Sequence, residues 1–284
     1  MMISYLVVNW NGGEIFKKSL LSIQTMMEGS AHNYEIIIVD NASADFDEEW
    51  IRKNIAGVLI EKNEVNVMFA RGTNQSIKLV SGELLCIINN DIIFHPGCIE
   101  NLIKGLERNK CDLVVPKMLN PDGTVQKSIR NFPTLAGIMA SAIGIDRLNR
   151  KFDTWLLHNF DYNKFSFVQQ PMFSAILLPK DTWKTVGDMD ENFPILFNDV
   201  DWFKRFINIG LKACFIPDAV VTHVHGMSVN KRRFKKVYNS TCGMYRYFIK
   251  HGDRNLIFKP SLFFVLGTTF AGRLFSEFFI KRWR

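Results

Sequence analysis

Cysteine is scarce in this sequence, and its five cysteines are not arranged in pairs. Their number is odd, and no C-x-x-C motif occurs among them. Disulfide-stabilised secreted domains have a dense, even set of cysteines, and structural zinc sites have closely spaced pairs. The sequence therefore argues against a disulfide framework and against a zinc site. It favours a reducing compartment and predicts a cytoplasmic protein.

Long apolar runs and targeting segments are also absent. A membrane-spanning helix needs about 20 consecutive apolar residues. The nearest candidate, residues 261–272, has only twelve and lies between Pro260 and Arg273. The amino terminus leads directly into an apolar run over residues 3–8, with no basic segment and no small-residue cleavage site. We therefore expect neither a signal peptide nor a membrane-spanning helix.

Motifs that mark several other classes of protein are missing as well. No G-x-G-x-x-G follows the first apolar run, which disfavours a Rossmann dehydrogenase. No G-x-S-x-G is present to supply a covalent nucleophile. The sequence lacks repeats and low-complexity linkers, and its 47% of hydrophobic residues excludes a disordered chain. A globular protein remains.

Negative charge is sparse only toward the end of the chain. The sequence has 35 Lys+Arg against 28 Asp+Glu, a net charge of +7, but residues 231–284 alone have 13 against 2, a net of +11. The other 22 against 26 give residues 1–230 a net charge of −4. This mildly acidic body and the lack of a recognition motif disfavour a nucleic-acid-binding protein. We predict one domain over 1–230 and a basic, aromatic-rich helical segment over 231–284.

Strand-like and helix-like patterns alternate in the first hundred residues. Short apolar runs typical of buried strands occupy residues 3–8, 34–39, 58–60 and 84–88. Helical spacing covers residues 14–27 and 73–80. This alternation predicts an α/β fold with a parallel sheet covered by helices on both faces.

The pattern becomes mixed after about residue 112. We expect further strands over 113–115, 173–178 and 213–216, and an amphipathic helix over 199–209. Residues 120–123 read as a turn, and residues 132–170 as an irregular, aromatic-rich stretch.

Polar side chains follow three of the predicted strands where each strand ends. These clusters are Asn9 with Asn11, then Asp40, Asn41 and Ser43, then Asn89, Asn90 and Asp91. In parallel α/β sheets the ligand sits beyond the carboxyl ends of the strands. We therefore expect the three clusters to converge on a binding site.

Each cluster suggests a chemical role and also has a structural alternative. Asp91 can hold a divalent cation through oxygen, although Asn and Asp are also common turn formers. Asp40 can accept a hydrogen bond from a nucleobase, with Ser43 either holding ribose or capping the next helix. Arg71 can neutralise phosphate at a helix N-terminus, or it is simply a solvated surface residue.

Two aspartates and a histidine in the second half are further candidates. Asp199 and Asp201 begin the predicted helix but lie two residues apart, so they do not share a helical face. One can serve as a base near an acceptor hydroxyl, while the other complements the helix dipole. For Asp201 the dipole role and the site role are equally well supported, whereas for Asp199 the site role is favoured. His223 is either a structural histidine or a ligand of a cation or diphosphate. His225 points the opposite way in an extended segment, so both do not bind one metal.

Taken in order, these motifs resemble those of family 2 glycosyltransferases. The matching segments are residues 7–13, 39–43, 66–74, 89–91, 121–123, 132–134, 188–193, 198–201, 217–219 and 223–228. The resemblance covers about residues 3–230 and is closest to the rhamnosyltransferase-like branch that builds bacterial surface polysaccharides. Each motif is short, but their number and order make the resemblance specific.

The resemblance implies a GT-A fold, a mixed and mainly parallel sheet with helices on both faces, followed here by the C-terminal helical segment. It also implies a dTDP- or UDP-linked sugar donor, Mg²⁺ or Mn²⁺ as cofactor, and inversion at the anomeric carbon. By position, the nucleotide-binding residues are Asn9, Asp40, Ser43, Arg71, Asn74 and Asn90. Asp91 and His223 would bind the metal, and Asp199 would be the catalytic base. The acceptor or diphosphate would meet Asn198, Asp201, Lys231 and Arg232.

The sequence departs from the family pattern at two positions. The D-x-D motif is reduced to Asn89, Asn90 and Asp91, which leaves Asp91 as the single carboxylate available to bind a metal. Asn198 stands where the family has a glutamate before the base, and this removes a charge that can raise the pKa of a neighbouring carboxylate. The alternative is therefore a catalytically weak or inactive nucleotide-sugar-binding protein of the same fold.

The basic segment suggests where such an enzyme works. Aromatic and basic residues mixed over 258–284 suit a helix lying at an anionic membrane surface. Because the acceptors of such enzymes are usually lipid-linked, we expect peripheral attachment at the inner face of the cell membrane. The alternative is a helix packed on its own domain or on a dimer partner, so a homo-oligomer stays open.

Overall fold

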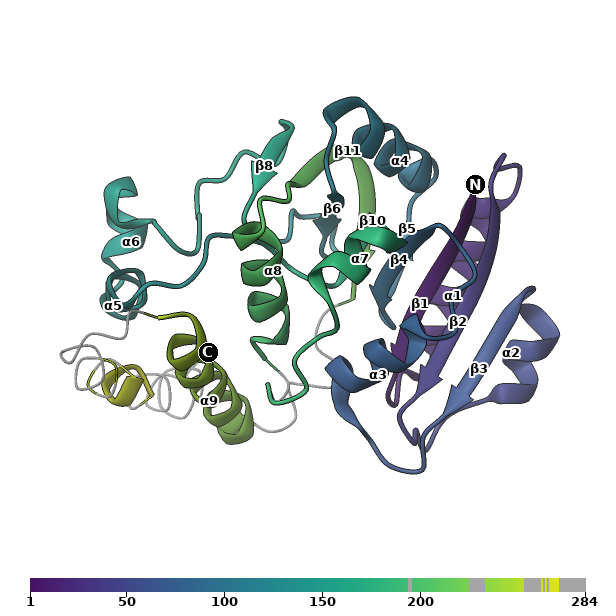
Figure 1. Ribbon diagram of the computed structural model, residues 1–284, viewed down its shortest axis with the longest axis horizontal. Coiled ribbons are helices and arrows are strands. Elements are labelled where there is room, and N and C mark those ends of the chain that lie inside the picture. The colour runs from purple at the N-terminus through teal and green to yellow at the C-terminus, as the bar shows by residue number, and fades with distance from the viewer. Residues whose placement is uncertain (194–195, 225–232, 253–261, 263, 265, 271–284) are drawn as a thin grey trace.

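The computed structural model describes residues 1–193, 196–224, 233–252, 262, 264 and 266–270. Its centre is a nine-stranded sheet in the order β3-β2-β1-β4-β10-β6-β11-β5, with β8 paired to β11 (Figure 1). The strands are β1 (Met2–Asn9), β2 (Asn33–Asp40), β3 (Val58–Lys62), β4 (Leu84–Asn89), β5 (Ile92–Phe94), β6 (Leu113–Leu119), β8 (Ser166–Val168), β10 (Ala175–Pro179) and β11 (Ala213–His223). A separate two-stranded sheet joins β7 (Ile129–Arg130) to β9 (Gln170–Pro171).

Most strands of the large sheet run in one direction. β1 pairs in parallel with β2 and β4, β2 with β3, and β6 with β11. β10 runs antiparallel between β4 and β6, while β5 and β8 run antiparallel to β11. The carboxyl ends of β1, β2, β4, β6 and β11 therefore meet along the same edge, as the sequence predicts for the start of the chain.

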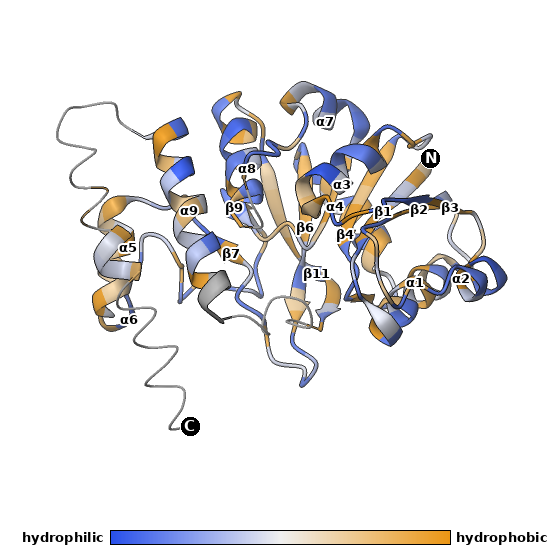
Figure 2. Ribbon diagram, turned by 90° about the horizontal axis from the view of Figure 1, so that it is seen from below, coloured by the Kyte–Doolittle hydropathy of each residue, from blue (hydrophilic) through white to orange (hydrophobic). Residues whose placement is uncertain are grey.

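Helices cover both faces of this sheet. The first face packs against α1 (Gly13–Met27), α2 (Glu48–Asn54) and α4 (Cys98–Asn109), and the second against α3 (Met68–Ile77), α7 (Lys180–Val186) and α8 (Asn198–Asn208). Alternation along β1 explains the two layers: Tyr5 and Val7 join the first cluster, whereas Leu6 joins the second. Figure 2 shows hydrophobic strands between helices with polar outer faces.

A third hydrophobic cluster joins the described part of the basic segment to the body. Helix α9 (Arg233–His251) contributes Met244, Tyr247 and Phe248, which pack with Phe197 and with residues around α5 (Leu135–Ile143). The helices α6 (Ile145–Leu148) and η1 (Arg150–Phe152) follow α5. Leu262 and Leu266, within the stretch considered for membrane contact, are also buried in this cluster. No helix in the described ranges is long and apolar enough to cross a membrane.

The expectation from composition that the cysteines form no disulfide is wrong. Cys111, just after α4, and Cys214, in β11, form a disulfide with a Cα–Cα distance of 6.1 Å. They are 103 residues apart, so no local spacing signals the pairing. The sheet brings them together because β11 lies beside β6, which begins two residues after Cys111.

Candidate functional site

A buried hydrogen-bond network spans the carboxyl ends of β2, β1 and β4. The register places Asn9 opposite Asp40, and both are almost fully buried. Asn9 Nδ2 donates to Asp40 Oδ1 at 2.8 Å, and Asn9 Oδ1 accepts from Asn90 Nδ2 at 2.8 Å. The predicted convergence of Asn9, Asp40 and Asn90 is thus present as one connected network.

Ser43 closes the network on the side of β2 and does not cap a helix. Its hydroxyl donates to Asp40 Oδ1 at 2.6 Å, and its backbone N–H donates to Asp40 Oδ2 at 2.9 Å. The helix that follows begins at Glu48 with Asp47 as its N-cap, so the expected capping role of Ser43 is wrong. A carboxylate has about four acceptor positions, and these contacts together with Asn9 leave one on Oδ2 of Asp40.

The loops around this network have unusual backbone conformations. Asn11, Ala42 and Met68 have left-handed φ angles of 50°, 55° and 70°. Such angles in non-glycine residues store strain and cluster at ligand sites. Gly12 is needed for a different reason: a Cβ there would lie 2.5 Å from Asn9 Oδ1 and 2.6 Å from Asn90 Nδ2.

Asn74 and Arg71 lie on α3, which begins at Met68, five residues before the predicted start. Asn74 is buried and ties α3 to the segment between α7 and α8, because it donates to Met189 O at 3.0 Å and accepts from Met189 N at 2.9 Å. Its amide groups are therefore already engaged by the protein. Arg71 is exposed, with its Nε 4.0 Å from Glu191 Oε2, and its charge is available at the surface.

Asp91 and His223 face each other across neighbouring strands. β5 pairs with β11 so that Ile92 lies opposite His223, and Val224 N donates to Asp91 O at 3.0 Å. His223 Nε2 lies 3.3 Å from Asp91 Oδ1, with side-chain exposures of 3% and 13%. Asp91 Oδ1 is buried and makes no hydrogen bond. On the other side of the ring, His223 Nδ1 lies 2.7 Å from Gln126 Oε1.

This pair fits a divalent cation. Octahedral ions bind their ligands at about 2.0–2.1 Å, which places adjacent ligands about 3 Å apart. The 3.3 Å separation of Nε2 and Oδ1 agrees with that geometry, and a buried carboxylate oxygen without a hydrogen bond needs a positive partner. No cluster of three or more His, Cys, Asp or Glu occurs among the described residues.

Asp199 lies at the N-terminus of α8, where the helix dipole favours an anion. Its Oδ1 accepts from Val200 N at 2.8 Å, and its own N–H donates to Asn198 Oδ1 at 2.7 Å. Burial raises the pKa of the Asp199 carboxyl, although the Val200 N–H and the positive charge of Arg130 lower it. The net upward shift makes this carboxylate a stronger base than an ordinary aspartate.

Asp201 occupies a structural position, away from any ligand surface. It is fully buried, and its oxygens contact Arg205 Nε at 3.1 Å, Lys250 Nζ at 2.8 Å and His251 Nε2 at 2.7 Å. The two-residue spacing from Asp199 turns it to a different face of α8. This corrects the acceptor or diphosphate role: Asp201 joins α8 to α9. Lys231 and Arg232 lie outside the described residues.

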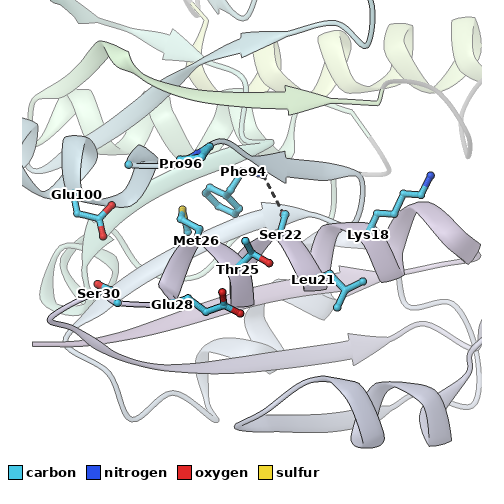
Figure 3. A pocket seen from close by; sticks show the side chains of 12 residues that line it. Lys18, Leu21, Ser22, Thr25, Met26, Glu28, Ser30, Phe94, Pro96 and Glu100 are labelled. Carbon is cyan, nitrogen blue, oxygen red and sulfur yellow. Dashed lines mark hydrogen bonds between the residues drawn. The ribbon is translucent and has the colours of Figure 1, made fainter.

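A cavity of 590 Å³ opens elsewhere, between α1, β5 and the start of α4 (Figure 3). Its lining includes Lys18, Met26, Glu28, Phe94 and Glu100. None of the predicted site residues borders it, so this cavity is separate from the network at the strand ends.

Two side chains of the site were missed by sequence reasoning. Gln126, which contacts His223, follows the turn over 120–123, and Arg130, which acts on Asp199, lies in β7. Both belong to the segment after β6, where the sequence has no regular strand-like or helix-like hydrophobic pattern. The only signals near them were the short motifs over 121–123 and 132–134.

Comparison with known sequences finds a matching family model and distant relatives. The family model described as "Glycosyl transferase family 2" matches residues 4–168, more than half of the chain. An N-acetylglucosaminyl-diphospho-decaprenol L-rhamnosyltransferase of Mycobacterium tuberculosis is 22% identical over 76% of this chain and 74% of that protein. The O-antigen biosynthesis protein RfbC of Myxococcus xanthus is 24% identical over 70% of this chain, which spans only 15% of that protein.

Solved structures share the fold at low sequence identity. The mannosyltransferase PcManGT from Pyrobaculum calidifontis, in complex with GDP-Man and Mn²⁺, matches with a TM-score of 0.62 at 14% identity, over 97% of this chain and 74% of that one. GalNAc-T7 with UDP, GalNAc and Mn²⁺ matches with a TM-score of 0.58 at 13% identity, over 80% and 44%. These likenesses confirm the predicted GT-A fold.

Proposed function

Because this chain belongs to glycosyl transferase family 2, we propose that it is an inverting enzyme that moves a sugar from a nucleoside diphosphate to a saccharide or lipid-linked saccharide. The observation that carries the proposal is the Asp91–His223 pair beside the network of Asn90, Asn9 and Asp40. It joins a place for a divalent ion to a place for a nucleoside at one edge of the sheet.

The nucleoside would meet the end of β2. Asp40 is held rigidly by Asn9 and Ser43 and keeps one acceptor position on Oδ2. A thymine or uracil base offers one imide N–H, which such an oxygen can accept. This match favours a dTDP- or UDP-linked donor. Arg71, exposed on α3, would add positive charge near the phosphates.

Asp91 and His223 would hold Mg²⁺ or Mn²⁺. The bound ion would neutralise charge that develops on the diphosphate leaving group. Both structural neighbours were solved in complex with Mn²⁺, which supports a divalent ion here. The chain's contribution is a buried carboxylate oxygen and a ring nitrogen aimed at the same point.

Asp199 would act as the base in a single displacement. Its carboxylate takes the proton of an acceptor hydroxyl while that oxygen bonds to the anomeric carbon. The bond from the anomeric carbon to the diphosphate oxygen breaks at the same time, so the configuration inverts and no covalent enzyme intermediate forms. The raised pKa of Asp199 suits this proton transfer. Asn198 fixes the Asp199 backbone through its side-chain oxygen.

The sugar and acceptor are proposed from the relatives. The mycobacterial protein is named a rhamnosyltransferase that acts on a decaprenol-linked saccharide, and the myxobacterial one an O-antigen biosynthesis protein. We propose rhamnose as the sugar and a role in bacterial cell-surface polysaccharide synthesis. A lipid-linked acceptor requires the enzyme to reach the inner face of the membrane.

Exposed apolar residues near α5 support such peripheral contact. Ile143 is 76% and Leu148 is 87% exposed, and Phe152 is also exposed. The exposed cations Arg147 and Lys151 are the sequence neighbours of Leu148 and Phe152. A mixed apolar and basic surface is suited to an anionic lipid interface. The basic residues after 270 lie outside the described ranges.

A second candidate is a nucleotide-sugar-binding protein with little or no catalysis. The single carboxylate in residues 89–91 and the Asn198 at the family's glutamate position favour it. A panel of nucleotide sugars, each assayed for donor hydrolysis and transfer with Mg²⁺, Mn²⁺ or EDTA, separates the two. Metal-dependent turnover of one donor supports the transferase. Donor binding without turnover under any condition supports the binding protein.

A further inference from the structure

The turn after β6 is linked to His223 by a chain of side-chain hydrogen bonds. The chain runs through Asp122, Thr124, Asn120 and Gln126, and each consecutive pair of side chains is in contact. Two backbone bonds hold the turn in shape, from Asn120 N to Thr124 O at 2.8 Å and from Gln126 N to Met118 O at 2.8 Å. The turn includes the motif over 121–123, to which the proposed chemistry gives no role.

The direction of every bond follows from the first one. An ionised carboxylate only accepts hydrogen bonds, so the Thr124 hydroxyl donates its single hydrogen to Asp122 Oδ1, at 2.6 Å. The Thr124 oxygen must then accept from Asn120 Nδ2, at 2.9 Å. This places the Asn120 oxygen toward Gln126, whose Nε2 donates to it at 3.0 Å.

The last bond decides the protonation of the histidine ring. With its amide nitrogen turned to Asn120, Gln126 presents Oε1 to His223 Nδ1 at 2.7 Å. Because an amide oxygen cannot donate, Nδ1 must have the proton. The lone pair of a neutral ring is then on Nε2, the nitrogen that lies 3.3 Å from Asp91 Oδ1.

We propose that residues 120–126 form a positioning relay, in which Asp122, Thr124, Asn120 and Gln126 fix the Nδ1–H tautomer of His223 and thereby present Nε2 to the divalent ion. Metal-binding histidines generally donate their other N–H to an oxygen that orients the ring. Here that oxygen belongs to Gln126, and the hydrogen-bond chain that starts at the exposed Asp122 carboxylate fixes the orientation of the Gln126 amide. The inference rests on the proposed function only through the metal; the tautomer itself does not depend on it.

The tautomer can be read directly by NMR. Full-length protein with ¹⁵N-labelled histidine would be recorded without metal in mildly alkaline buffer. The His223 ring, one of six in the chain, would be assigned with a His223→Asn variant. The expected spectrum has a proton on Nδ1 in the wild type and a shift of that proton toward Nε2 in Gln126→Leu.

Metal affinity gives the second readout. With Mn²⁺ alone, titrated by electron paramagnetic resonance, Gln126→Leu should bind about 10- to 100-fold more weakly than the wild type. Thr124→Val, which keeps the shape but removes the donor to Asp122, should lose about fivefold, the value of one hydrogen bond. Gln126→Glu keeps an acceptor for Nδ1–H and should retain the wild-type tautomer.

Matched controls distinguish the relay from general damage. Gln24→Leu also removes a glutamine oxygen that accepts one hydrogen bond, from Ala56 N. Thr185→Val removes a hydroxyl that donates to Asp181 O on the exposed side of α7. Neither should change the tautomer of His223 or the Mn²⁺ affinity. If Gln126→Leu does not fold, Thr124→Val together with its control decides the question.

The outcomes separate the relay from the proposed function. An unprotonated Nδ1 in the wild type, or a tautomer that is the same in Gln126→Leu and Thr124→Val, overturns the relay. Weak Mn²⁺ binding by the wild type with the expected tautomer change leaves the relay standing and contradicts the metal role of Asp91 and His223. A change in both readouts, absent from the controls, supports both.

Discussion

Gly12 gives the most direct test of the network at the strand ends. Its φ of −82° is open to alanine, so a Gly12→Ala change introduces no backbone strain and acts only through its new Cβ. That atom would lie 2.5 Å from Asn9 Oδ1, 2.6 Å from Asn90 Nδ2 and 2.7 Å from Phe16 Cβ. The first two atoms are polar ends of the network that holds Asp40.

The size of the effect follows from these distances. Moving Asn9 Oδ1 from 2.5 Å to an ordinary contact of 3.4 Å requires a shift of 0.9 Å. Added to a 2.8 Å hydrogen bond, such a shift gives 3.7 Å and breaks it. Loss of the Asn90–Asn9 and Asn9–Asp40 bonds, at about 1 kcal/mol each, together with overpacking predicts a loss of about 2–4 kcal/mol in the free energy of unfolding. Because Asp40 is displaced too, we expect at least about tenfold weaker nucleotide binding.

The assay combines urea unfolding with calorimetric titration of UDP and dTDP. Gly267→Ala is the matched control, because a Cβ there meets nothing within 4 Å, and its stability should be unchanged or slightly higher. Removing the Asn90 side chain in Gly12→Ala/Asn90→Ala should restore about 1 kcal/mol of stability but not nucleotide affinity. A Gly12→Ala protein with wild-type unfolding and wild-type nucleotide affinity would refute the reasoning.

Three further predictions concern the carboxylates of α8 and their neighbours. Asp201→Asn leaves Arg205, Lys250 and His251 without their buried anion and should lower the free energy of unfolding by about 3 kcal/mol, measured in urea. Burial raises the pKa of Asp201, but hydrogen bonds from His251 and Lys250 outweigh it and lower the pKa overall. The stability difference between the wild type and Asp201→Asn should therefore be largest at neutral pH and disappear as the pH falls below about 3.9. Arg130→Met removes a charge that lowers the pKa of Asp199, so the acid limb of kcat/KM against pH should move to higher pH; an unmoved limb contradicts the assignment of Asp199 as base. Asp199→Asn should raise the thermal unfolding temperature at neutral pH, because a buried carboxyl with a raised pKa destabilises the folded state once it is ionised.

The early part of the fold was predictable because its strands are continuous apolar runs. β1, β2 and β4 lie where those runs are, and their polar ends bring Asn9, Asp40 and Asn90 together. The expected helix over 73–80 is wrong by several residues, because α3 begins at Met68, whose N–H is bonded by Asn66 Oδ1. That capping contact comes from a loop residue whose side chain no periodic pattern places.

The second half shows where sequence reasoning stops. Gln126 and His223 are 97 residues apart and meet only because β6 and β11 pair in parallel. The same pairing explains the disulfide between Cys111 and Cys214. Asp201 reads as a site residue from its neighbour Asp199, but its burial against α9 depends on packing in the third hydrophobic cluster. Such contacts follow from the assembled sheet and not from spacing along the chain.

The central claim is that Asp199 is the base of an inverting sugar transfer, and one comparison tests it most directly. Turnover and donor affinity would be measured side by side for the wild type and Asp199→Asn, with the best donor of the nucleotide-sugar panel and Mn²⁺. We predict that turnover falls by about 10²- to 10⁴-fold while donor affinity changes by less than about threefold. Turnover that survives the substitution, or a wild type that binds the donor and never turns it over, would contradict the account.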